Sequence, residues 1–147
     1  MSSRYHNHDE EIDYFIGTIV FKEDILEQII SKSKLKKLGE CEIHVYPNEG
    51  PIPHFHLKNN DGFETCICIF SNRYFIHGKY RDTLTSAQLK QLDEWLSSNF
   101  DPISTNWYMI RSSWEILNEM YKNRSSYIKY KNIYKKPDYT TIVGYSE

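Results

Sequence analysis

Between residues 42 and 79 the chain alternates apolar and polar side chains and is interrupted only by short turn sequences, and this pattern limits the fold more than any other feature. Ile43 and Val45 fall on one face of an extended segment and their polar neighbours fall on the other, as in a half-buried strand. Interruptions this short connect antiparallel neighbours, because a parallel crossover needs about a dozen residues or more. The sequence therefore predicts an antiparallel meander, with strands over 42–46, 54–58, 64–70 and 73–79.

After the meander, the spacing of apolar residues lengthens to three and four, which is typical of helices packed on a sheet. Thr85 and Gln88 fit a capping box at the start of one such helix, and the Asp101-Pro102 step ends it. A further strand is predicted over 14–21. The predicted fold class is α+β, an antiparallel meander sheet of four to five strands packed on one face by about three helices, at 22–38, 86–98 and 104–122.

The formal net charge of −2 conceals an uneven distribution of charge along the chain. Residues 121–136 carry six basic and no acidic side chains, so the rest of the chain has a formal charge of −8. These shifts in composition predict a flexible acidic arm over 1–13, a single α+β domain over 14–120 and a basic, tyrosine-rich C-terminal extension over 121–147.

Composition also indicates where the chain works. No apolar run approaches the roughly 20 residues that cross a bilayer, and the first residues do not form a secretory signal. The three cysteines contain no CxxC pair and are typical of free thiols in a reducing compartment. We therefore expect a cytoplasmic protein with no membrane partner; its oligomeric state is not predicted.

Two histidines separated by one residue, His54 and His56, are the sharpest chemical feature. On a strand they point to the same side, where two imidazoles can share one metal ion and a neighbouring strand can add a ligand. His77 is the natural third ligand and His44 the next. Three nitrogens and an open position would form a hydrolytic site for a divalent metal such as zinc.

Two interpretations of this pair without a metal remain open. The histidines can form a hydrogen-bonded pair that fixes the proline-rich loop before them, or they can line a metal-free polar pocket that titrates near neutral pH. The cofactor prediction is therefore none, with the divalent metal as its alternative, and no catalytic residue is assigned.

The basic extension offers a second kind of chemistry. Lysines interleaved with tyrosines can neutralise phosphates while the rings stack on unpaired bases. The alternative is that the segment packs on an acidic surface, either that of the rest of the chain or that of a protein partner. The candidate residues for binding a partner or nucleic acid are Lys122, Arg124, Tyr127, Lys129, Tyr130, Lys131, Tyr134, Lys135 and Lys136.

Four short elements occur together between about Ile43 and Glu115. They are a strand ending in Tyr46, the run Pro53-His54-Phe55-His56, a helix with a central Trp95, and a second helix entered through Asn106-Trp107. As a set they resemble an uncharacterised family of small bacterial and phage proteins with a Pro-His-Phe-His motif, and the resemblance covers about half of the chain. The chain departs from the family's usual Pro-Pro-His-Phe-His, because Ile52 separates its prolines.

The family has no settled activity, but many of its members lie in toxin–antitoxin-like gene neighbourhoods. The resemblance therefore implies a small interaction module in bacterial or phage conflict that binds a protein or a nucleic acid. The alternative is a metal-dependent hydrolase or nuclease that uses the His54 and His56 pair. We expect the non-enzymatic module, since neither a nucleophile elbow nor a phosphate-binding loop accompanies the histidines.

Overall fold

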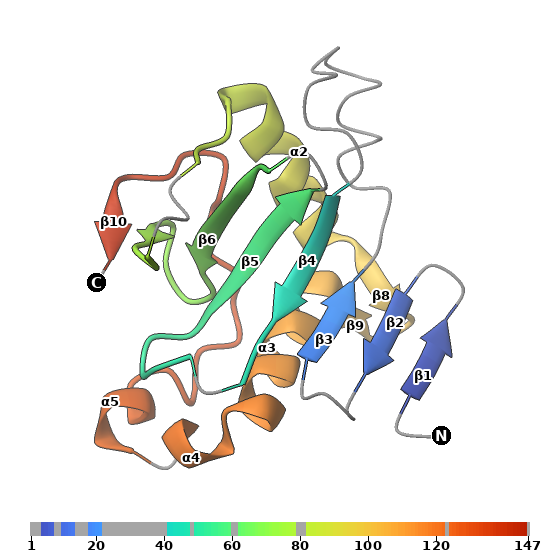
Figure 1. The fold of residues 1–147 in the computed structure, drawn as a ribbon, viewed down its shortest axis with the longest axis vertical. Coiled ribbons are helices and arrows are strands. Elements are labelled where there is room, and N and C mark those ends of the chain that lie inside the picture. The colour runs from blue at the N-terminus through green and yellow to red at the C-terminus, as the bar shows by residue number, and fades with distance from the viewer. Residues whose placement is uncertain are drawn as a thin grey trace.

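The computed structural model describes residues 4–7, 10–13, 18–21, 41–47, 49–59, 62–78, 82–122 and 124–146. The helix predicted over 22–38 lies outside these residues. Within them, eight strands form one sheet in the order β1-β2-β3-β4-β5-β6-β7-β10 (Figure 1). Neighbours from β1 to β7 run antiparallel, whereas β10 joins β7 in parallel. The strands are β1 Arg4–Asn7, β2 Glu10–Asp13, β3 Thr18–Phe21, β4 Cys41–Val45, β5 His54–Asn59, β6 Glu64–Cys68, β7 Tyr74–Phe75 and β10 Tyr145–Ser146.

The described helices follow the meander in the chain. They are α2 Ser86–Ser97, α3 Asn106–Leu117, α4 Glu119–Lys122 and α5 Ser125–Ile128, and a small hairpin of β8 Asn99–Asp101 and β9 Ser104–Thr105 separates the first two. The predicted capping box begins α2, with Thr85 accepting from the backbone of Gln88. The two long helices, α2 and α3, lie on the same face of the sheet (Figure 1). None of the described helices has both the length and the apolar content needed to cross a membrane.

The α+β class and the largely antiparallel sheet are confirmed, but the sheet is wider than the four to five strands predicted. Residues 4–7 and 10–13 were predicted as part of a flexible arm, but they form β1 and β2. These two strands pair with each other, and β2 also pairs with β3. The helix predicted over 104–122 is divided, because Asn118 leaves helical geometry between α3 and α4 with φ −119° and ψ 43°. The domain limits at residues 14 and 120 stay a prediction.

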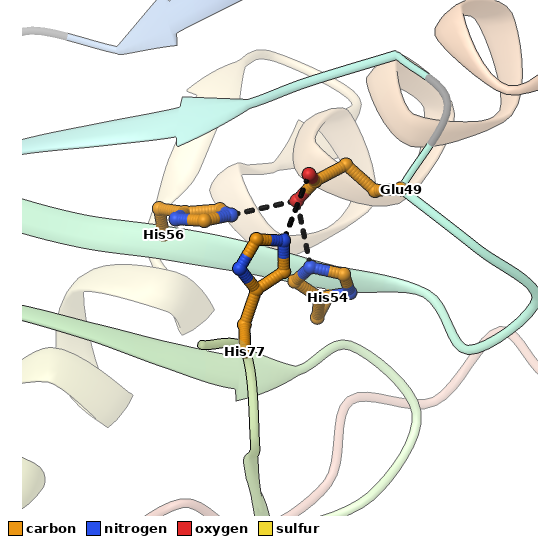
Figure 2. A group of neighbouring side chains, drawn as sticks. All are labelled: Glu49, His54, His56 and His77. Carbon is orange, nitrogen blue, oxygen red and sulfur yellow. Dashed lines mark hydrogen bonds and ion pairs between the residues drawn. The ribbon is translucent and has the colours of Figure 1, made fainter. Parts of the chain in front are cut away.

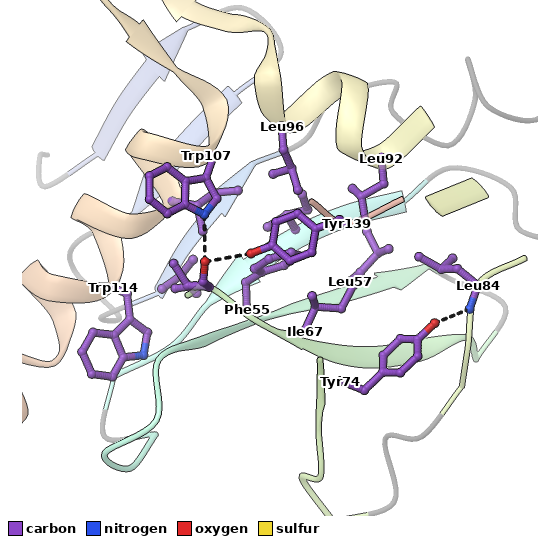
Figure 3. Close-up of a cluster of buried hydrophobic side chains, with 14 of the residues drawn as sticks. Phe55, Leu57, Ile67, Tyr74, Leu84, Leu92, Leu96, Trp107, Trp114 and Tyr139 are labelled. Carbon is purple, nitrogen blue, oxygen red and sulfur yellow. Dashed lines mark hydrogen bonds between the residues drawn. The ribbon is translucent and has the colours of Figure 1, made fainter. Parts of the chain in front are cut away.

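The hydrophobic core lies between the sheet and the pair of long helices (Figure 3). Alternation along β5 directs Phe55 and Leu57 into it, and both are fully buried. From the helices, Trp114 is fully buried, while Trp95 packs half-buried at the margin. This layer is built from Ile43, Val45, Phe55, Leu57, Ile67, Ile69, Leu89, Leu92, Leu96, Trp107, Ile110 and Trp114.

The C-terminal extension contributes to the same core through Tyr139. Its ring is fully buried (Figure 3). Its hydroxyl donates to the backbone carbonyls of Cys68 at 2.7 Å and Ile69 at 2.8 Å. The indole of Trp107 donates to the same Ile69 carbonyl at 2.9 Å. The extension is therefore tied to the end of β6 by hydrogen bonds between residues 71 and 70 positions apart.

We predict that Tyr139→Phe lowers the free energy of unfolding by about 1–2 kcal/mol, because the Cys68 carbonyl loses a buried donor while the ring still fills its space. Urea unfolding followed by far-UV circular dichroism measures the change. Tyr145→Phe is the matched control, since Tyr145 is 40% exposed and the same substitution there should cost less than about 0.5 kcal/mol. Equal losses in the two variants would contradict this account of Tyr139.

The same buried phenol predicts how stability changes at alkaline pH. Burial raises the pKa of Tyr139 well above its ordinary value, whereas in the unfolded chain the group ionises near pH 10. Above pH 10 the unfolded state therefore releases a proton that the folded state retains, so the free energy of unfolding falls as pH rises, by up to about 1.4 kcal/mol per pH unit. Tyr139→Phe should make this fall less steep between about pH 10 and pH 11, and an unchanged slope would refute the assignment.

Candidate metal centre

The face of the sheet that points away from α2 and α3 carries the histidines. His54 and His56 alternate along β5 with the core residues Phe55 and Leu57, so both rings leave the same side of the strand, as predicted. They are nevertheless 1% and 2% exposed. The ring of Phe75 stacks on His54 at a centroid distance of 4.2 Å, and the ring of Tyr46 meets His56 edge-on at 4.7 Å.

Four side chains converge at this position: Glu49, His54, His56 and His77. One ligand-type atom from each lies within 4.8 Å of all the others. The Nε2 atoms of His54 and His56 lie 2.8 Å and 2.7 Å from Glu49 Oε1, and His77 Nε2 lies 3.1 Å from Glu49 Oε2 (Figure 2). We call these four residues the His–Glu cluster.

The two buried rings are oriented from behind by acceptors. His54 Nδ1 lies 2.9 Å from the carbonyl oxygen of Ile52, and His56 Nδ1 lies 2.8 Å from Glu64 Oε2. An imidazole whose Nδ1–H donates to a carbonyl or carboxylate keeps the Nε2 lone pair for a cation, which is the arrangement around most histidine-bound metals. Ile52 and Glu64 thus aim both Nε2 atoms at the centre of the cluster.

The acceptors that surround the two buried rings also suit a bound cation. Both nitrogens of His54 and of His56 face acceptors, with Glu49 on one side and Ile52 or Glu64 on the other. Each ring nitrogen is therefore within hydrogen-bonding distance of an oxygen acceptor. A divalent cation placed between the two Nε2 atoms and Glu49 would satisfy the same carboxylate.

The carboxylate itself is ionised. Burial alone would raise the pKa of Glu49, but the hydrogen bonds from His54 and His56 outweigh burial and hold that pKa well below its ordinary value. The cluster therefore presents one fixed negative charge to three imidazoles.

The loop that carries Glu49 is fixed by the end of α3. Asn118, fully buried as the C-cap of that helix, accepts the backbone N–H of Glu49 at 3.1 Å. Its amide nitrogen donates to the carbonyls of Tyr46 and Trp114, each at 3.0 Å. One side chain thereby connects the helical layer to the loop and sets the position of Glu49.

Sequence reasoning found three members of the cluster and missed the fourth. His54, His56 and His77 are brought together, whereas His44 lies outside the cluster, with its Nε2 2.6 Å from Glu42 Oε1. Burial lowers the pKa of His44. Glu49 was not predicted, because it lies in the proline-rich loop five residues before His54, outside the strand alternation that identified the histidine pair.

The predicted partner-binding residues of the extension are divided by the structure. Tyr127 is 1% exposed and belongs to the core, Tyr130 is half-buried on Phe70, and Lys136 pairs with Asp93. The side chain of Lys122 lies outside the described part of the structure. The exposed candidates are Arg124, Lys129, Lys131, Tyr134 and Lys135.

Comparisons of this chain with protein-family models, with curated proteins and with solved structures find no match. The function is therefore argued from the geometry of the site.

As a candidate metal centre, the cluster should bind added zinc about tenfold to a hundredfold less tightly in Asn118→Ala than in the unchanged chain, because Glu49 loses the contact that positions it. The affinity is measured by competition with a chromogenic chelator. Asn106→Ala is the matched control, since Asn106 is also a buried amide on α3 and donates to the Trp95 carbonyl at 2.8 Å, away from the cluster. Both variants should lose about 1–3 kcal/mol of stability. Equal zinc affinities in the two would show that Asn118 is structural only.

Proposed function

We propose that this chain binds one divalent transition-metal ion through the His–Glu cluster and uses it to catalyse hydrolysis. The observation that carries the proposal is the convergence of Glu49, His54, His56 and His77 within 4.8 Å, with two Nε2 atoms aimed inward. Three imidazoles and one carboxylate are ligands that suit zinc, iron, cobalt and nickel. Zinc is the first ion to test, because it needs no redox partner.

The cluster is open to solvent on one side. Its ligand atoms lie within 4.8 Å of one another, so the side chains would draw together around an ion held by bonds of about 2.0–2.1 Å. The side chain of His77 is 33% exposed, so water and substrate would enter from its side.

The proposed chemistry is that of a metal-activated water. Bound there, a divalent ion would supply a water activated for attack on a carboxylic or phosphoric ester. His54, His56 and His77 would hold the ion through their imidazoles, and Glu49, which is ionised, would be the fourth ligand. The role in bacterial or phage conflict implied by the family resemblance stays a prediction.

Metal analysis tests the first half of the proposal. Protein purified without an affinity tag should contain close to one equivalent of zinc, iron, cobalt or nickel per chain by mass spectrometry of the elements. His56→Ala should lose this metal, because it removes a ligand and the ring that Glu64 orients. His44→Ala is the matched control on the same face of the sheet and should retain it.

Hydrolysis is tested separately with chromogenic carboxylic and phosphoric esters. The metal-loaded protein should cleave at least one class, removal of the metal with a chelator should abolish turnover, and zinc should restore it. Stoichiometric metal without turnover on any ester would leave the metal site standing and reject the enzyme. Absence of metal, together with no binding of added zinc or iron, would reject both.

A further inference from the structure

A buried arginine holds the C-terminal extension in one shape. Arg111, on α3, is 3% exposed. Its Nε donates to the carbonyl of Ile133 at 2.9 Å and its Nη2 to the carbonyl of Lys131 at 3.0 Å. Glu115, one helical turn on, balances its charge at 3.4 Å. The guanidinium therefore fixes the backbone of residues 131–133 from inside the protein.

The same guanidinium supports an exposed aromatic ring. Its carbon lies 4.5 Å from the ring centroid of Tyr134, a cation–π contact that holds the ring from below. Tyr108, on α3, stacks beside Tyr134 at 6.4 Å with an angle of 29° between the rings. Tyr134 is still 63% exposed and Tyr108 37%. Two adjacent rings are thus held in position and remain accessible.

Exposed basic residues lie close to Tyr134 in the chain. Residues 124–136 contain five basic and no acidic side chains. Lys136 is used by its ion pair with Asp93. Lys131 and Lys135, on either side of Tyr134 in sequence, are exposed. We call Tyr108, Lys131, Tyr134 and Lys135 the Tyr134 surface.

We propose that the Tyr134 surface binds single-stranded nucleic acid, independently of the metal centre. Exposed lysines that flank Tyr134 in sequence, together with two exposed rings, suit the phosphates and bases of an unpaired strand. An acidic peptide could pair with the lysines but would gain nothing from the ring faces, because the face of an aromatic ring carries negative potential. A duplex hides its bases and would likewise leave the rings unused.

The surface differs from the candidate set read from the sequence. It does not include Tyr127, which is buried, or Tyr130, which is half-buried. It also leaves out Lys136, which forms an ion pair with Asp93. Tyr108 is added from a helix more than twenty positions earlier in the chain, which only the fold could reveal. The proposal therefore identifies a small composite platform in place of a continuous basic tail.

The test is fluorescence anisotropy with the full chain and labelled oligonucleotides of about 12 nucleotides, a length within the usual footprint of such sites. An unpaired oligothymidine or oligouridine should bind more tightly than a duplex of the same length. The affinity should fall as salt rises from about 50 to 200 mM, because bound counterions are released. Recovery of the oligonucleotide at full length confirms that binding, and not cleavage, is measured.

Matched variants separate the ring from the charges. Tyr134→Ala should weaken binding by about tenfold, and Tyr134→Phe should retain it, because stacking needs the ring and not the hydroxyl. Tyr145→Ala, at another exposed tyrosine, should have no effect. The double variant Lys131→Ala and Lys135→Ala should weaken binding and reduce its dependence on salt, without touching the rings.

Three results would overturn the proposal. One is the absence of binding by the folded protein at low salt. Another is binding that Tyr134→Ala and the double lysine variant leave unchanged. The last is equal affinity for a polyglutamate peptide, which would show recognition of negative charge alone. Thermal unfolding of each variant verifies that Arg111 still holds the extension, and Tyr134→Phe keeps the comparison interpretable if Tyr134→Ala is destabilised.

Discussion

The outer face of the sheet depends on a single ionised carboxylate, that of Glu49, placed among three imidazoles. A half-buried charge is costly unless hydrogen-bond donors or opposite charges match it at short range. The match requires each ring to be turned correctly, which explains the acceptors behind His54 and His56. It also requires the loop that carries Glu49 to be held in one position, which the buried amide of Asn118 does. The position of Glu49 on the outer face thus depends on the end of α3, which packs on the inner face.

The period of two along β5 builds both the core and the site. Phe55 and Leu57 enter the hydrophobic layer, while His54 and His56 enter the His–Glu cluster. A shift of one residue in the pairing of β5 would exchange the two sets and bury imidazoles against α3. The hydrophobic effect that holds the register therefore also holds the ligands in place. A change that shifts the register of β5 would therefore disturb both the core and the His–Glu cluster.

Much of this was predictable, because it rests on local periodicity. Alternation predicted the meander and the shared face of His54 and His56, and the place of His77 in the same meander made it the natural third ligand. Glu49 could not be placed, since a loop with three prolines has no period and its path is set by Asn118, 69 positions away.

The C-terminal extension shows the same limit. Its composition suggested a segment separate from the domain, yet Tyr139 and Tyr127 are buried in the core. The energy of those contacts comes from partners such as Cys68 and Glu115, which no local pattern connects to the tyrosines. Composition indicated the charge of the extension, whereas the places where its tyrosines pack depend on contacts that composition does not encode.

The parallel pairing of β10 with β7 has a consequence for the order in which the protein is completed. His77 follows a two-residue strand that is held on one side by β6 and on the other by residues 144–146, through bonds to the backbone of Tyr74 and Ile76. During synthesis His77 leaves the ribosome nearly seventy residues before that second support exists. Both edges of the strand that precedes His77 can therefore be paired only after residues 144–146 have been synthesised.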